Sequence, residues 1–113
     1  MATQVGSLIF FSGLDPKSLE NPGTIHAPGD IAKQTDYTIA KLEKYLEAAG
    51  CSLDDVVKVT AYIDDMKKWA SFNAAYNRRF ANEAARPSRT TVPAGAFEDG
   101  MCVELDVIAV VRE

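Results

Sequence analysis

The segment Met101–Val111 reads Met-Cys-Val-Glu-Leu-Asp-Val-Ile-Ala-Val-Val, and it decides the fold. The run predicts a long β-strand with apolar residues on both faces. Glu104 lies in its middle. A carboxylate in such a place has to be paired, hydrogen-bonded or protonated, because burying it alone costs several kcal/mol or more.

A second charged residue stands in a similar setting. Arg89 opens a shorter β-branched run just after Pro87. We predict that Arg89 and Glu104 project from neighbouring strand ends into one cleft, where an arginine fork recognises a carboxylate and a glutamate holds or activates a water. Taken alone, Arg89 is better explained as a structural ion-pair partner. Glu104 alone is equally well explained as a buried pair or as a catalytic acid/base.

The composition limits which classes of protein this chain can belong to. The chain has 113 residues, of which 47% are apolar and 25% charged, so we predict one folded domain over 1–113 with a real core. The net charge of −4 argues against a nucleic-acid surface. No apolar run approaches the roughly 20 residues of a membrane helix. We see no secretory signal, and two cysteines make no disulfide framework, so a cytoplasmic location is expected.

Hydrophobic periodicity and turn residues predict the elements. A hairpin turn is expected at Gly6-Ser7, and a helix capped by Asp30 is expected to end before Gly50. In chain order we predict strands over 2–5 and 8–12, a loop over 13–29, a helix over 30–49, a strand over 56–63, a helix over 66–82, and strands over 89–92 and 101–111. This is an α+β pattern with two helices on one face of a mixed sheet.

The predicted elements include none that would cover the second face of the sheet. Leu8–Phe11 and Met101–Val111 are apolar on both faces, yet both helices are expected on the same side. Self-association is therefore predicted.

Several stretches, in order along nearly the whole chain, resemble one family. They are Val5–Gly13, Leu46–Gly50, Leu53–Thr60, Phe72–Tyr76, Arg86–Arg89 and Val103–Val110. Through them the chain resembles the RidA/YjgF family of reactive-intermediate deaminases, which are small imine and enamine hydrolases. The resemblance implies a chorismate-mutase-like α+β sandwich that assembles as a homotrimer with a barrel core and active sites at the subunit clefts.

The resemblance also implies roles for particular residues. Arg89 falls on the arginine that binds the substrate carboxylate, and Glu104 on the catalytic glutamate near the hydrolytic water. Ser12, Asn73 and Thr91 fall on further substrate-binding positions. No cofactor is implied, because a protonated imine is already electrophilic.

The other chemically capable residues have plainer interpretations. Ser12 has no nearby histidine base, since the one histidine, His26, lies in the long loop, so no serine-hydrolase triad is expected. His26 with Cys51 and Cys102 lacks metal-ligand spacing, so no metal site is expected. Asp106 is interpreted as a structural partner or a surface carboxylate. A basic group, expected to be a solvated face, consists of Arg78, Arg79 and Arg86.

The chain departs from the family pattern in two places that touch the substrate. The sequence begins after the point where the family carries a Gly-Pro-Tyr-Ser segment with a pocket tyrosine. Leu14-Asp15-Pro16 stands where Gln-Ile-Pro is common, and the loop that follows is longer.

The leading functional prediction is hydrolytic deamination of a small enamine or imine of the 2-aminoacrylate type, which releases ammonia and a 2-oxo acid. The partners expected are a small carboxylate substrate and two further copies of the chain, without nucleic acid or membrane. One alternative is a larger dicarboxylic enamine such as 2-aminomuconate. The others are a ribonuclease and a non-catalytic, metabolite-binding or chaperone-like trimer.

Overall fold

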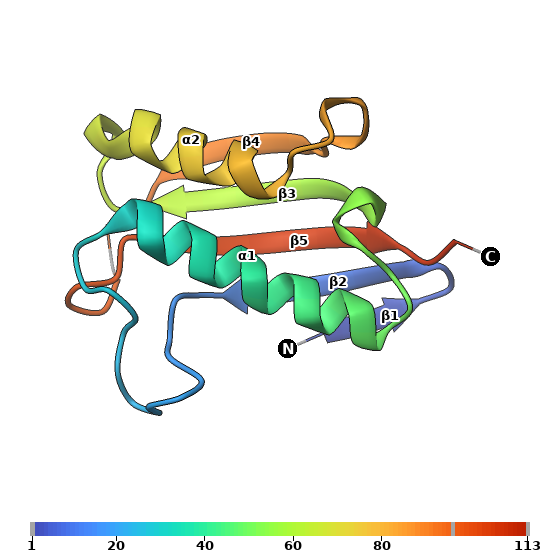
Figure 1. Cartoon of the computed structure of the whole chain (residues 1–113), viewed down its shortest axis with the longest axis horizontal. Coiled ribbons are helices and arrows are strands. Elements are labelled where there is room, and N and C mark those ends of the chain that lie inside the picture. Colours follow the sequence, from blue (N-terminus) through green and yellow to red (C-terminus); the bar gives the residue numbers. More distant parts are fainter. Residues whose placement is uncertain (1, 96, 113) are drawn as a thin grey trace.

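Five strands form one mixed sheet in the order β1-β2-β5-β3-β4, and two helices lie across one of its faces (Figure 1). The computed structural model describes residues 2–95 and 97–112. The elements are β1 (Ala2–Val5), β2 (Leu8–Leu14), α1 (Ile31–Ala48), β3 (Val56–Ile63), α2 (Trp69–Arg79), β4 (Ser88–Pro93) and β5 (Val103–Val110), with short 3₁₀ turns at Leu53–Asp55, Met66–Lys68 and Glu83–Ala85. The predicted α+β class, element order and one-sided helix cover are confirmed.

The strand pairing decides which residues become neighbours. β5 lies at the centre, antiparallel to both β2 and β3, whereas β4 pairs with β3 in parallel. β4 is therefore an edge strand, separated from β5 by β3.

Local signals define α1 well. Asp30 caps its start by accepting a hydrogen bond from the Lys33 backbone N–H at 3.0 Å. Gly50, with φ of 76°, follows the end of the helix in the conformation that glycine favours. On the sheet side Leu42 and Leu46 are fully buried. Each such side chain stabilises the fold by about 1.5–3 kcal/mol relative to an exposed position.

The alternation along β5 separates a closed face from an open face of the sheet. Leu105 and Val107 are buried under the helices, whereas Glu104 and Ile108 are half-buried on the other side. On β2 the open face presents Leu8 and Phe10, each 38% exposed. We call this helix-free side of the sheet the open face, and the side covered by the helices the closed face.

Two predicted elements are shorter in the structure, and the second strand, predicted over 8–12, runs on to Leu14. The second helix is shorter than 66–82, because Asp65 accepts from the Lys67 N–H and caps a 3₁₀ turn first, and because Phe80 leaves the helical conformation. The final strand is shorter than 101–111, since ladder pairing runs only over Val103–Val110. No helix in the described part of the chain is long and apolar enough to cross a membrane.

The segment 15–28, predicted as part of a long loop, is tied to α1. The His26 ring stacks on Tyr37 with 4.1 Å between ring centroids, and the Leu19 N–H donates to the Tyr37 hydroxyl at 2.9 Å. Lys41 donates to the Lys17 carbonyl at 2.9 Å. These contacts join both the start and the end of the segment to α1.

Candidate functional site

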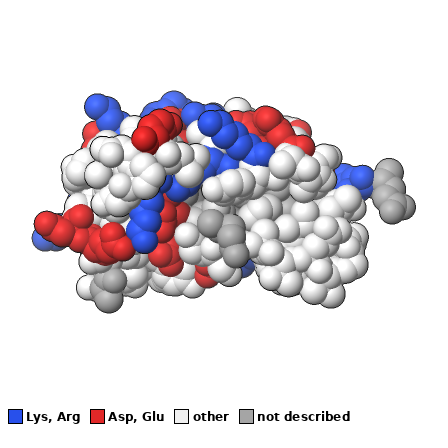
Figure 2. Space-filling view, turned by 90° about the horizontal axis from the view of Figure 1, so that it is seen from below, with Lys and Arg blue, Asp and Glu red and all other residues white. Residues whose placement is uncertain are grey.

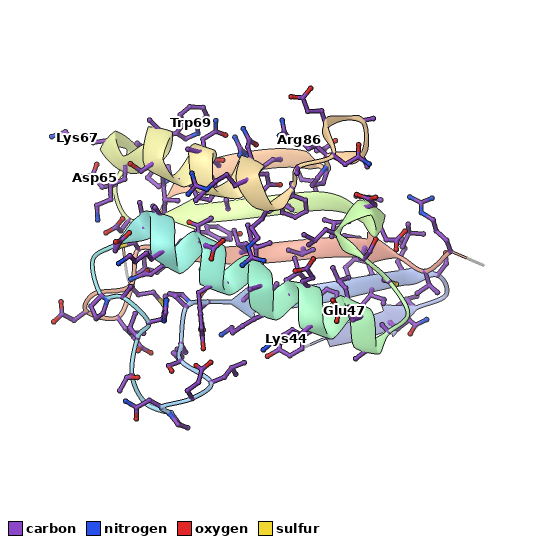
Figure 3. All side chains as sticks on the ribbon, in the orientation of Figure 1. Lys44, Glu47, Asp65, Lys67, Trp69 and Arg86 are labelled. Atoms are coloured by element: carbon purple, nitrogen blue, oxygen red, sulfur yellow. The ribbon has the colours of Figure 1, made fainter. Side chains whose placement is uncertain are left out.

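Arg89 lies on the closed face of the sheet, beneath α2. Its pairing with Val59 of β3 turns the side chain toward the helices. The guanidinium carbon stands 5.8 Å from the Trp69 ring centroid, 5.4 Å from that of Phe72 and 4.6 Å from that of Tyr76. Figure 3 shows Trp69 at the outer edge of α2. The aromatic stripe predicted for this helix thus supports a half-buried cation at the sheet edge.

Tyr76, the ring nearest to Arg89, is uncharged. Burial raises the pKa of its hydroxyl to about 12, although the guanidinium groups of Arg89 and Arg86 oppose the rise. The phenol therefore stays protonated at neutral pH and does not neutralise the charge of Arg89.

Glu104 lies on the open face, opposite Tyr62 of β3. It lines a cavity of about 350 Å³ between the loop after β2 and the loop after β4. Partial burial raises the pKa of its carboxyl group. The carboxylates of Asp106 and Asp15 add to the rise, and the ammonium of Lys17 opposes it. A carboxyl group tuned upward in a cavity is suited to exchange protons.

Asp106 has the structural role predicted for it. Its carboxylate accepts a hydrogen bond from the Gly13 N–H at 3.2 Å and another from the Tyr62 hydroxyl at 3.3 Å. These bonds hold the end of β2, with the exposed Ser12, on the same open face as Glu104.

The prediction that Arg89 and Glu104 share a cleft is wrong within one chain. β3 separates their strands, and the two side chains point to opposite faces of the sheet. Thr91 pairs with Ala61 on the same face as Arg89, and Asn73 is half-buried on α2, one residue after Phe72.

The candidate residues therefore form two groups. We call Arg89, Thr91 and Asn73 the arginine half-site. We call Ser12 and Glu104 the glutamate half-site.

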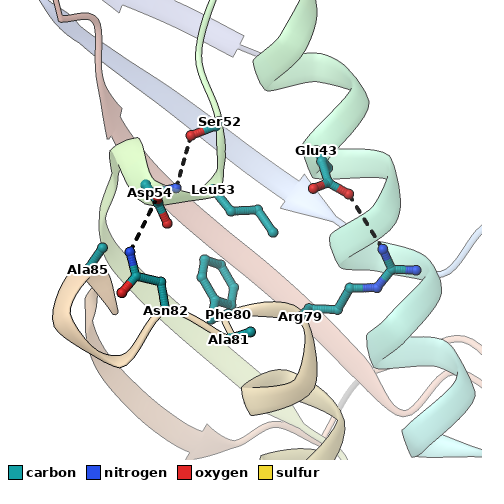
Figure 4. Close-up of a pocket in the computed structure, with 9 residues that line it drawn as sticks. All are labelled: Glu43, Ser52, Leu53, Asp54, Arg79, Phe80, Ala81, Asn82 and Ala85. Carbon is teal, nitrogen blue, oxygen red and sulfur yellow. Dashed lines mark hydrogen bonds and ion pairs between the residues drawn. The ribbon is translucent and has the colours of Figure 1, made fainter.

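The basic group is not simply a solvated face. Arg79 pairs with Asp36 at 2.7 Å and with Glu43 at 3.5 Å, beside a cavity of about 290 Å³ at the end of α2 (Figure 4). Arg86 donates to the Phe80 carbonyl at 2.7 Å. Both arginines hold helix ends in place.

Among the described residues, no cluster of three or more His, Cys, Asp or Glu side chains is arranged to hold a metal ion. Cys51 and Cys102 are buried and free.

The comparisons with known proteins agree on one family. The family model described as endoribonuclease L-PSP matches residues 1–111. The chain belongs to the YjgF/RidA family.

A RutC family protein of Pyrococcus abyssi is 35% identical over 96% of this chain and 82% of its own length. The 2-iminobutanoate/2-iminopropanoate deaminase of Escherichia coli K12 is 32% identical over 96% of this chain and 83% of its own. The crystal structure of the Escherichia coli YjgF gene product has a TM-score of 0.83 and 31% identity, and the match covers 98% of this chain and 86% of that one.

Proposed function

We propose that this YjgF/RidA family member is a hydrolytic deaminase of small 2-imino acids and their enamine tautomers, of the 2-aminoacrylate type. The observation that carries the proposal is Glu104, a half-buried carboxyl group of raised pKa in a cavity of about 350 Å³. The deaminase from Escherichia coli, 32% identical, supports the reaction class. The free, buried cysteines favour a reducing, cytoplasmic setting.

The complete site forms between two copies of the chain. Because the two half-sites lie on opposite faces, one chain cannot offer both to a small substrate. A neighbour that covers the open face brings its arginine half-site against Glu104. The exposed side chains of Leu8 and Phe10 favour such cover, and in a closed homotrimer every chain uses both half-sites.

The reaction then needs only these side chains and water. The enamine tautomerises to the imine, and Arg89 pairs with the substrate carboxylate. The Glu104 carboxylate takes a proton from water as the water oxygen bonds to the imine carbon, and the C=N electron pair moves to nitrogen. Glu104 returns that proton to nitrogen, which gives a carbinolamine. Glu104 then carries the hydroxyl proton to the amino nitrogen, the C–N bond breaks as the C=O bond forms, and ammonia and a 2-oxo acid leave. Ser12, Asn73 and Thr91 are proposed to hydrogen-bond the substrate.

The test is the release of ammonia and 2-oxo acid from imines generated in situ by an amino-acid oxidase. We expect the protein to accelerate release above the buffer rate, and Glu104→Gln to remove the acceleration. The matched control is Glu47→Gln, an exposed carboxylate on α1 (Figure 3). No acceleration by the wild-type protein contradicts the proposal.

RNA cleavage is the second candidate, favoured by the description of the family model as an endoribonuclease. The net charge of −4 opposes it. Binding to a short RNA that weakens steeply with salt, together with cleavage lost in Glu104→Gln, would support it.

A further inference from the structure

The Glu104 cavity is built from two loops and the central strand. Asp15 and Lys17 come from the loop after β2, and Glu98 comes from the loop after β4. These side chains line the same cavity as Glu104, so in the proposed site they face the substituent that the substrate carries.

A buried cation fixes Asp15 at the cavity wall. Lys41 of α1 is 7% exposed, and its ammonium lies 2.9 Å from the Lys17 carbonyl and 3.7 Å from the Asp15 carboxylate. A buried ammonium is stable only when it is paired, so Lys41 and Asp15 hold each other in place. The Lys41 contact therefore keeps the Asp15 side chain in the cavity wall.

Among the described residues that line the cavity, Lys17 supplies the one ammonium group, and that group is already paired. Its Nζ lies 3.1 Å from a Glu98 carboxylate oxygen and 3.9 Å from one of Asp15. The wall holds the three carboxylates of Asp15, Glu98 and Glu104 against this single ammonium. With Lys41 behind the wall, three carboxylates stand against two ammonium groups while Glu104 is ionised, as it is when it takes the proton from water, so a second substrate carboxylate is repelled and a cation is attracted.

The rest of the wall is apolar. Phe97 and the buried Met101 line the same cavity. A substituent with an aliphatic stem gains from contact with them, and a cationic head on that stem reaches the carboxylates.

We propose that the enzyme selects 2-imino acids whose side chain is an aliphatic stem ending in a cation, and discriminates against those that carry a second carboxylate. Asp15 and Glu98 are the specificity-determining residues. This selectivity rests on the proposed imine hydrolysis.

The experiment compares three imines with the same trimethylene stem, generated in situ from arginine, norleucine and 2-aminoadipate by amino-acid oxidases. Semicarbazide trapping measures the imine that remains. We expect kcat/KM to fall in that order, with about tenfold or more between the arginine-derived and the aminoadipate-derived imines. Asp15→Asn and Glu98→Gln should each reduce this ratio several-fold. Glu98 is an exposed residue, so its variant tests the idea even if Asp15→Asn unfolds, and Glu47→Gln should leave the ratio unchanged.

The outcomes separate the two proposals. If the aminoadipate-derived imine is hydrolysed as fast as the arginine-derived one, the proposed selectivity is wrong, but imine hydrolysis is still supported. A ratio that stays unchanged in Glu98→Gln and in a folded Asp15→Asn overturns the residue assignment. If none of the three imines is hydrolysed above the buffer rate, imine hydrolysis itself has failed.

Discussion

Among the described residues, Arg89 is held by aromatic rings and not by a carboxylate. Its guanidinium lies 4.6 Å from the Tyr76 ring centroid, and this contact orients the planar fork without neutralising it. An arginine prepared in this way is free to pair with a substrate carboxylate.

Arg89→Lys should therefore fail to replace arginine. A point ammonium neither stacks on the rings nor offers a bidentate fork. We expect kcat/KM for imine hydrolysis to fall tenfold or more, about 1.4 kcal/mol, while the fold is kept. Steady-state kinetics beside circular dichroism measures both. Near-full activity in Arg89→Ala would exclude the role.

Glu104→Gln should lower kcat and raise stability. The folded-state pKa of Glu104 lies above its ordinary value, so the folded state binds this proton more tightly than the unfolded state. The stabilisation that the Glu104 proton gives the folded state is fully present below the pKa of the unfolded state, about 4.5. It is lost as pH rises through the pKa of the folded state. Glutamine titrates nowhere in this range.

The free energies of unfolding of wild type and Glu104→Gln should thus diverge in favour of the variant as pH rises from about 4 to 7. Urea melts across this pH range measure the difference. A variant that grows less stable than wild type toward pH 7 would show that Glu104 is a structural anion instead.

At the scale of elements, the sequence predicts what is encoded locally. The cap at Asp30 and the hairpin turn at Gly6 depend on a few adjacent residues, and both are confirmed. The parallel pairing of β4 with β3 is a long-range choice that no local spacing records. For that reason Arg89 and Glu104 were expected side by side, although the strand order separates their strands and the pairing register turns their side chains to opposite faces.

The loop 13–29 shows the same limit. Its glycines and prolines predict an irregular segment, but the anchor is Lys41, a residue in the next helix. A lysine on a helix is usually exposed, so nothing in its own neighbourhood signals that this one is buried.

Lys41→Met should loosen the loop while leaving α1 intact. Without the ammonium, the Lys17 carbonyl and Asp15 lose their partner. We expect amide exchange at Ser18 and His26, whose N–H groups donate within the loop, to quicken at least tenfold, about 1.4 kcal/mol of local opening. Lys44→Met, an exposed lysine on the same helix (Figure 3), is the control. Unchanged exchange in Lys41→Met would contradict the anchor.

At the scale of the molecule, apolar and charged surfaces are segregated. Figure 2 shows a broad uncharged area over the end that carries the β1–β2 hairpin, with charged residues gathered toward the other end. Exposed large apolar residues at the hairpin include Val5, Leu8 and Phe10. Surface of this kind favours burial against another copy of the chain.

The assembly should be a trimer that depends on the open face. Sedimentation equilibrium should give about three times 12.3 kDa for the wild type. Phe10→Lys, which puts a charge on the open face, should dissociate it and abolish imine hydrolysis. Met66→Lys, at an equally exposed apolar residue in a 3₁₀ turn outside the sheet, should do neither. A wild-type monomer at micromolar concentration would contradict both the assembly and a site formed between copies.

Mixing two inactive variants gives the sharpest test of a shared site. Arg89→Ala chains keep Glu104, and Glu104→Gln chains keep Arg89. If each site takes its arginine from one chain and its glutamate from the next, randomly mixed trimers restore about a quarter of the sites. Co-refolding the two variants should therefore recover roughly that fraction of wild-type kcat, whereas either variant refolded alone should remain inactive. If co-refolded mixtures that exchange subunits stay inactive, both residues serve the same site from one chain, and the opposite-face geometry of β4 and β5 has no catalytic meaning.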